Sequence, residues 1–193
     1  FDPTNTSKYY RYEYDETYKV IAPRWINKEA IVEMFPSSPT KPGKITIKER
    51  TTEAKTCYAN KKSDNIILTS TSNLSQDRVD FPVRFIASTD YVIANRYSII
   101  VSQYIQNLPA YTFYQTLKSL SGNESLLSQN QPGFFSGNIK SDTDANEKVI
   151  GFFDVSSYSE KRMFFNFEDV FPNTTKPGYF FDCYNDQMSI IDP

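Results

Sequence analysis

The chain has 193 residues, and its 21 Lys and Arg against 23 Asp and Glu give a net charge of −2. This balance disfavours a nucleic-acid partner, because phosphate binding needs a concentrated positive surface. The sequence contains no histidine, which removes Ser-His and Cys-His nucleophile pairs and the histidine zinc motifs. The 15 Phe, 14 Tyr and only 6 Gly favour a well-packed β structure over disorder.

The first half of the chain predicts a series of strands. Residues 9–21 alternate most clearly, with Tyr10, Tyr12 and Tyr14 on one face and charged residues between them. Glu16 lies on the same face as these tyrosines. We expect its carboxylate either to turn outward at a bulge or to be buried and bonded to the backbone or to an arginine.

Weaker patterns follow. Residues 28–35 fit a short helix or a strand equally well, and the prolines after them forbid regular structure. Further strands are predicted at residues 45–47, 56–60, 66–72 and 79–86. Pro82 makes the last of these an edge strand or a bulged one.

The second half combines one helix with further strands. Residues 96–106 alternate as a strand, and residues 108–121 then repeat apolar positions at helical spacing, with Asn107 as the N-cap. Strands are predicted at residues 147–155 and 161–167, joined by a hairpin loop. The chain is therefore expected to form one mainly β domain over residues 1–193, an antiparallel β-sandwich or curled sheet with one packed α-helix.

The order of motifs in this half resembles a known family. A strand and a helix are followed by QPG at residues 131–133, GNI at 137–139, VIGFF at 149–153 and KRMFF at 161–165. This order and spacing resemble a Bacteroidetes-type family of surface lipoproteins of unknown function, numbered forty-two forty-nine among domains of unknown function. The resemblance implies that the chain is a C-terminal portion, and that a signal peptide, a lipidated cysteine and an N-terminal β-sandwich domain precede it.

The same resemblance implies a role. It is that of a non-enzymatic lipoprotein at the outer-membrane surface, an accessory subunit of a TonB-dependent transporter or of a larger outer-membrane complex, without a cofactor or a metal. The lipid anchor would lie outside this chain, and no run of about 20 apolar residues exists to cross the membrane. Two alternatives stay open: a stand-alone extracellular module that binds carbohydrate or peptide, and a carboxylate-based hydrolase. The hydrolase would need two selected acids, and no local signature selects them.

The two cysteines, Cys57 and Cys183, are too few for a four-ligand zinc site. They are two thiols or one long-range disulfide. The resemblance implies an oxidising compartment, and members of the family pair an early and a late cysteine, so we expect the Cys57–Cys183 disulfide.

Two groups of residues are candidates for binding. Adjacent aromatics occur four times, and neighbouring residues of a strand face opposite ways, so one of each pair can be exposed. Core packing accounts for most of them, and the candidate partner contacts are Phe134, Phe135, Tyr179, Phe180 and Phe181. Asp142, Asp144 and Glu147 faintly resemble a calcium loop, but the missing glycine favours a solvated acidic turn.

Overall fold

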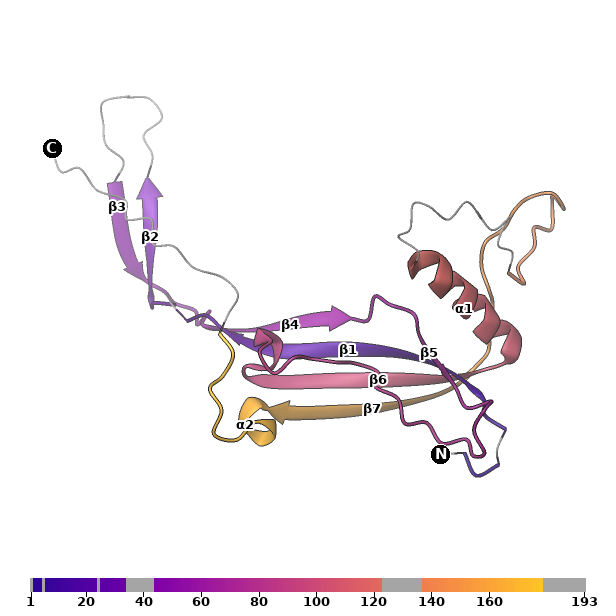
Figure 1. Ribbon diagram of the computed structural model, residues 1–193. Helices are drawn as coiled ribbons and strands as arrows, with labels where there is room; N and C mark the ends of the chain where they lie inside the picture. Colours follow the sequence, from indigo (N-terminus) through magenta and orange to yellow (C-terminus); the bar gives the residue numbers. More distant parts are fainter. Residues whose placement is uncertain (1, 5, 24, 34–43, 123–136, 179–193) are drawn as a thin grey trace. The chain divides into compact units, whose positions relative to one another are not determined.

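A computed structural model describes residues 2–4, 6–23, 25–33, 44–122 and 137–178 of the chain. Its fold is mainly β, with antiparallel sheets and one main helix (Figure 1), which confirms the predicted class. The strands are β1 (Tyr9–Ile21), β2 (Lys28–Glu33), β3 (Lys44–Glu49), β4 (Thr56–Lys62), β5 (Ile67–Ser70), β6 (Arg96–Gln106) and β7 (Ser157–Asn166). The helices are α1 (Leu108–Gly122), the single turn α2 (Phe167–Val170) and the 3-10 turn η1 (Tyr91–Ile93).

The strands form two open sheets. The larger has five strands in the order β4-β1-β6-β7, and β5 also pairs with β1, with Tyr9 opposite Ser70 and Tyr12 opposite Ile67. The smaller is the antiparallel pair of β2 and β3, in which Lys28 lies opposite Glu49. Residues 28–33 are thus a strand, so the ambiguous pattern there is resolved in favour of β structure.

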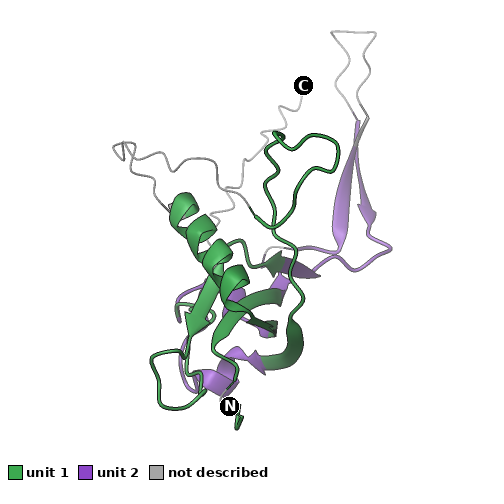
Figure 2. Cartoon of the chain, turned by 90° about the vertical axis from the view of Figure 1, so that its right-hand side faces the viewer, with its two compact units in different colours: residues 1–16, 61–87, 98–164 green, residues 17–60, 88–97, 165–193 purple. Residues whose placement is uncertain are grey.

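Two compact units make up the chain (Figure 2). Unit 1 contains residues 1–16, 61–87 and 98–164, and unit 2 contains residues 17–60, 88–97 and 165–193. Each unit is described by itself below. That the chain is a single domain stays a prediction.

In unit 1, β1 makes packing contacts on both of its faces. On one face Tyr10, Tyr12 and Tyr14 are buried, and the ring of Phe81 stacks on that of Tyr12 with centroids 6.2 Å apart. On the other face α1 packs on the sheet, with the ring of Tyr111 4.9 Å from that of Tyr9. Aromatic pairs at these separations add stability beyond the area they bury, so the alternation of β1 fixes both layers.

Helix α1 begins where its cap predicts. The side-chain oxygen of Asn107 accepts a hydrogen bond of 2.8 Å from the backbone N–H of Ala110, which would otherwise have no partner at the helix start. Ala110 is fully buried and Phe113 nearly so, so the apolar stripe of the helix faces inward. The predicted helix and its N-cap are confirmed.

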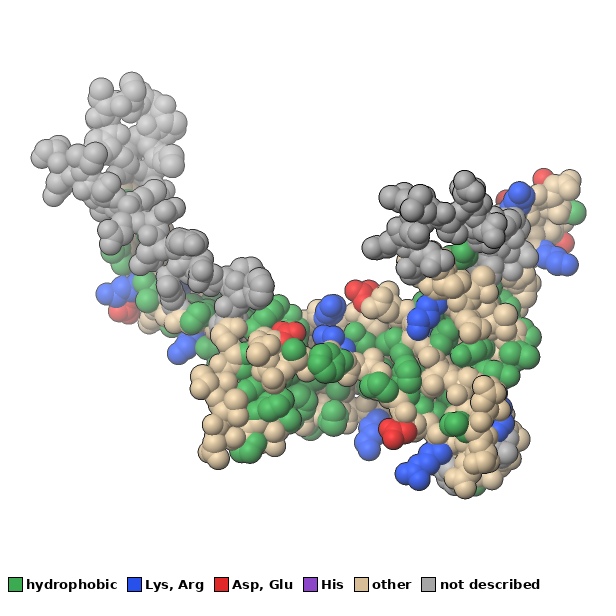
Figure 3. Space-filling view, viewed as in Figure 1, with side chains coloured by type: hydrophobic (Ala, Val, Ile, Leu, Met, Phe, Trp, Pro, Cys, Tyr) green, Lys and Arg blue, Asp and Glu red, His purple; other side chains and the backbone are tan. Residues whose placement is uncertain are grey.

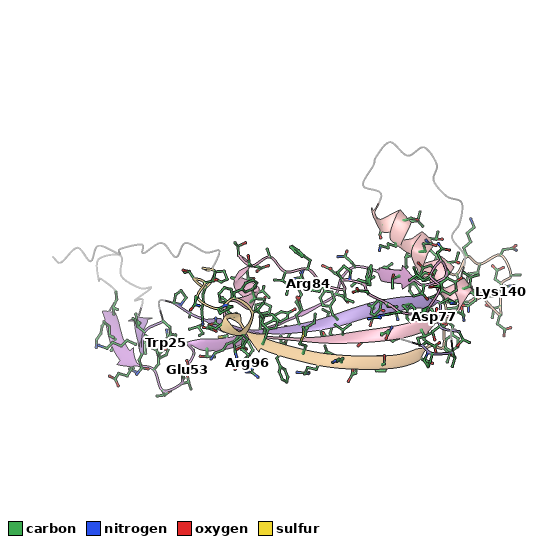
Figure 4. The ribbon with its side chains drawn as sticks, turned by 60° about the horizontal axis from the view of Figure 1, so that its bottom comes forward. Trp25, Glu53, Asp77, Arg84, Arg96 and Lys140 are labelled. Atoms are coloured by element: carbon green, nitrogen blue, oxygen red, sulfur yellow. The ribbon has the colours of Figure 1, made fainter. Side chains whose placement is uncertain are left out.

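Glu16 is buried on the tyrosine face of β1. The strand continues through it without interruption, and Arg84 donates a 2.6 Å hydrogen bond from Nε to its carboxylate. The guanidinium of Arg84 (labelled in Figure 4) also donates to the Phe85 carbonyl and lies 5.8 Å from the ring centre of Tyr14. Of the two expectations for Glu16, burial with an arginine partner is therefore confirmed.

Unit 2 is also built on aromatic contacts. The ring of Tyr18 meets that of Tyr91 edge to face at 6.1 Å, and Tyr97 packs on Phe165 at 5.2 Å. Phe167, the first residue of α2, is almost fully buried. The short helix starts in a capping box, in which the carboxylate of Asp169 accepts the backbone N–H of residue 166.

Two predicted strands are wrong. Residues 79–86 run along the sheet without joining a ladder, because Pro82 has no N–H to donate and Phe81 and Arg84 point onto β1. Residues 147–155 are also irregular. Their Phe153 backbone is bonded to a side chain, that of Asn138, where a strand would bond to another backbone.

The predicted hairpin loop at residues 156–159 is also wrong. Strand β7 begins at Ser157, because this segment already lies beside β6. The hydroxyls of Tyr158 and Ser102 lie 3.3 Å apart, and Ser159 donates to Gln103 at 3.3 Å. Polar residues that look like a loop in the sequence thus extend an outer strand of the sheet.

The ion pair of Glu16 and Arg84 gives a test of the core. Arg84→Leu leaves a fully buried carboxylate without its cation, and we expect the free energy of unfolding to fall by about 3 kcal/mol, because Arg84 is itself partly exposed. Lys62→Leu removes an exposed pair with Asp15 at 3.9 Å and should change the free energy by less than about 1 kcal/mol. Urea unfolding measures both, and equal losses would contradict a buried pair.

Candidate functional site

All five residues predicted to contact a partner lie outside the described residues. These are Phe134, Phe135, Tyr179, Phe180 and Phe181. Cys57 is a free, exposed thiol on β4, and Cys183 also lies outside the described residues. The described part of the chain contains no disulfide, and the pairing of the two cysteines stays a prediction.

The acidic segment with Asp142, Asp144 and Glu147 is an exposed turn. The carboxylate of Asp144 accepts the backbone N–H of Asn146 at 2.8 Å, and its carbonyl accepts that of Glu147 at 3.1 Å. Across the described residues, no three His, Cys, Asp or Glu side chains are grouped so that they could hold a metal ion. The hydrogen bonds of Asp144 are those of a polar turn, the alternative favoured over a calcium loop.

The two glycine motifs of the sequence meet in space. The side chain of Asn138 donates to the carbonyl of Phe153 and accepts from its N–H, both at 2.7 Å, as a neighbouring strand would. A Cβ on Gly137 would lie 1.4 Å from the carbonyl oxygen of Gly151. Only glycine permits this approach, so the GNI motif fixes the position of the VIGFF motif.

This arrangement leaves an exposed apolar segment, residues 150–155. Phe152 points inward and packs on Phe113 of α1 at 5.1 Å, whereas Phe153 is 71% exposed. Ile150 and Val155, 69% and 80% exposed, lie in the same segment. The expectation that one of two adjacent aromatics faces outward is thus confirmed here, and Figure 3 shows such hydrophobic side chains, in green, at the surface.

Hydrogen bonds of Asp154 join the apolar segment to the start of helix α1. The carboxylate of Asp154 accepts hydrogen bonds from the side chains of Gln106 and Asn107, each at 3.4 Å, and from the hydroxyl of Ser156. Asn107 also caps α1. The same polar contacts that begin the helix therefore hold the exposed segment beside it.

A hollow of about 480 Å³ lies between the apolar segment and β1. Arg11 lines the hollow on the side of β1, and its guanidinium lies 4.3 Å from the ring centre of Tyr104 and 4.9 Å from that of Tyr114. Glu13 pairs with this guanidinium and accepts a 3.1 Å hydrogen bond from the hydroxyl of Tyr104. The buried Nε of Arg11 has no acceptor among the described residues. Remaining walls are Phe152, Phe153, Asp154, Val155 and Ser156.

Two phenols at and beside this hollow, those of Tyr104 and Tyr158, have raised pKa values. Burial, and then the hydrogen bond to Glu13, raise the pKa of Tyr104. The hydrogen bond to Glu160 raises the pKa of Tyr158, whose ring lies 5.3 Å from that of Tyr104. The hollow thus offers the rings of Tyr104 and Tyr114 around the Arg11 guanidinium, which is paired with Glu13.

A polar cluster on the other face of β1 ties the start of the chain down. Lys8 lies 2.7 Å from the buried carboxylate of Asp77, and Thr71 donates a hydrogen bond of 2.7 Å to the same oxygen. Burial acts to raise the pKa of Asp77, and the hydrogen bonds from Lys8 and Thr71 outweigh it and lower that pKa below its ordinary value of 3.8. These three side chains stabilise the fold, because the buried carboxylate of Asp77 is bonded to both Lys8 and Thr71.

Comparison with known families now decides the membership of the chain. The family described as Domain of unknown function (DUF4249) matches residues 1–162, which include β1, β6, α1 and the contact between Gly137 and Gly151. The chain belongs to this family. No curated protein and no solved structure matches it. The matched residues include those of the hollow and of the apolar segment in this chain, and the family's description names no activity.

Arg11, which lines the hollow, was not among the residues predicted from the sequence to bind a partner. Arg11 looks like one of several charges on the outer face of β1, and its two tyrosines are 93 and 103 positions further on. The only signal was the alternation that put Arg11 and Glu13 on one face.

No helix of the described residues is long and apolar enough to cross a membrane.

The contact between Gly137 and Gly151 can be tested with a single methyl group. Gly137→Ala would press on a backbone carbonyl, so we expect a loss of about 1 to 3 kcal/mol and faster hydrogen exchange at the Phe153 amide. Gly178→Ala is the control, because no atom lies within 4 Å of its added Cβ. Similar exchange at Phe153 in both variants would show that the contact does not hold the segment.

The lowered pKa of Asp77 predicts how stability depends on pH. A carboxyl with a lowered pKa in the folded chain stabilises it above its unfolded pKa, and this stabilisation is lost as the pH falls through the folded value. The unfolding midpoint of the unmodified chain in urea should therefore fall from about pH 5 downward. Asp77→Asn should lower the midpoint at neutral pH and flatten this decline, and Thr71→Val should flatten it partly. Parallel profiles would contradict the assignment.

Proposed function

We propose that this protein is a non-enzymatic, lipid-anchored surface protein of the bacterial outer membrane. In this proposal it acts as an accessory subunit of a TonB-dependent transporter or of a larger outer-membrane complex. The observation that carries the docking role is the exposed apolar segment. Ile150, Phe153 and Val155 are each more than two thirds exposed, yet Asn138 and Asp154 hold their backbone in one place.

Rigid, exposed apolar groups favour binding to another protein. A flexible segment would lose conformational freedom on binding, and an ordered one has already lost it in folding. Exposed apolar surface beside polar groups is also typical of interaction sites. The hydrogen bonds of Asp154 and Asn138 supply such a polar border. The segment is thus suited to dock against a stable partner surface.

The glycine and asparagine of the GNI motif support the same interpretation. Their described contacts are with the backbone of residues 151–153, which they hold in position, and none is with an acidic side chain. The motifs that carry the family resemblance therefore build a platform.

The test is co-purification of the full-length protein from detergent-solubilised membranes. We expect a transporter-sized partner to be recovered. The double change Phe153→Ser and Val155→Ser should reduce its yield about tenfold or more, because it removes two apolar side chains that the partner would bury. Phe85→Ser is the control, since Phe85 is 80% exposed and lies outside the segment. Recovery of the unmodified protein only as a soluble monomer would contradict the proposal.

A second candidate function is a stand-alone module that binds carbohydrate or peptide. The observation in its favour is the hollow of Arg11, Tyr104 and Tyr114, since stacked rings beside a cation recognise sugars and peptide side chains. A glycan array and a calorimetric titration with the isolated chain separate the two candidates. Saturable binding that is lost in Arg11→Met would favour the module, because this change removes the cation and keeps much of the side-chain volume.

A further inference from the structure

Strand β7 forms an outer edge of the larger sheet. It follows β6 at the end of the order β4-β1-β6-β7, and Figure 1 shows no other labelled strand beyond it. Its residues 157–164, all in unit 1, are exposed on both faces. An edge of this length presents a row of backbone N–H and C=O groups that can pair with another strand.

On one face of β7 the row of side chains is complementary to the same row reversed. Successive residues of a strand point to opposite faces, so Tyr158, Glu160, Arg162 and Phe164 share one. Tyr158 lies against Tyr104 and Ser102, which places this face on the side of the sheet that bears Arg11. The order along it is aromatic, acidic, basic, aromatic. A reversed copy of this row therefore meets it with opposite charges.

We propose that β7 pairs antiparallel with β7 of a second copy of this chain, with Lys161 on the two-fold axis. A two-fold axis perpendicular to the sheet keeps each face continuous, so opposing residues must have the same parity. With Lys161 opposite Lys161 of the second copy, Glu160 lies opposite Arg162 and Tyr158 opposite Phe164, each twice. Cross-strand ion pairs and aromatic pairs are the contacts that stabilise antiparallel strands.

The described contacts leave Glu160 and Arg162 able to form these ion pairs. Tyr158 donates to Oε2 of Glu160, so the other carboxylate oxygen can accept from Arg162 of the second copy. Within the described part of the chain Arg162 makes no ion pair and is exposed. Shifting the axis by one residue to Glu160 or Arg162 would lose both ion pairs and bring like charges together on this face, so the charges specify one register.

The other face adds a cost that is itself informative. There Lys161 meets Lys161 of the second copy, and like charges opposite one another weaken strand pairing. The exposed Met163 lies opposite Ser159 on the same face. The proposed pairing is therefore reversible and concentration-dependent, and Lys161→Thr should tighten it. This inference does not depend on the outer-membrane assignment, because it concerns two copies of the chain alone.

Charge exchange tests the register. Glu160→Arg gives two arginines in the row, and Arg162→Glu gives two glutamates, so each variant repels itself. We expect the dissociation constant of either dimer to rise about tenfold or more in sedimentation velocity. Mixed together, the two variants should form a heterodimer, and the double variant that carries both changes should dimerise again. Circular dichroism and urea unfolding check that these exposed substitutions leave the fold intact.

Spin labels measure the same geometry as distances. In a background of Cys57→Ser and Cys183→Ser, labels at Lys161→Cys should lie on adjacent strands, close enough for strong line broadening. Labels at Ser157→Cys lie eight strand residues apart and should be separated by about 26 Å. A parallel pairing would give similar distances at both positions and would overturn the proposal. So would a purified chain that stays monomeric at hundreds of micromolar, or a dimer that neither charge variant weakens.

Discussion

Strand β1 makes packing contacts on both faces within unit 1, and the other features of that unit depend on this. Its tyrosines face a segment that contributes Phe81 and Arg84, and its charged residues face α1 and β6. A strand of a solvated sheet would place Arg11 and Glu13 in water. Because β6 and α1 supply Tyr104 and Tyr114, the Arg11 guanidinium instead lies against two aromatic rings, and the exposed Glu13 pairs with it.

The buried charges of unit 1 are consequently paired. Glu16 faces Arg84 and Asp77 faces Lys8, each at hydrogen-bond distance. An isolated charge removed from water would cost several kcal/mol, and a partner offsets much of this cost. Both pairs link β1 or its approach to the segment of residues 77–84, whose Asp77 also forms a β-bridge with Asp2. Charge pairing thus adds to backbone hydrogen bonding in holding this segment.

The exposed apolar segment and the β7 edge are two different ways of presenting a surface. The segment is irregular backbone fixed by side chains, chiefly those of Asn138 and Asp154. The edge is regular backbone whose own polar groups are the binding elements. The proposed docking to a foreign protein and the proposed pairing with a second copy therefore use different residues of unit 1.

Local patterns determined much of the fold by themselves. The strand at β1, the helix with its Asn107 cap, the strand at β6 and the mainly β class were all readable, because each depends on neighbours within a few residues. The burial of Glu16 with an arginine was one of two predictions. The sequence places this side chain on one face of the strand, but it does not show which residues pack on that face.

Contacts between distant residues decided the rest. The segments at 79–86 and 147–155 have the composition of strands, yet their partners are the side chains of β1 and of Asn138. Residues 157–159 resemble a loop and become a strand because β6 is beside them. Arg11, Tyr104 and Tyr114 form one site only after β1, β6 and α1 have packed. The sequence alone therefore determined the elements that have a clear local repeat or cap, and tertiary structure decided the segments and the site whose conformation depends on particular side chains far along the chain.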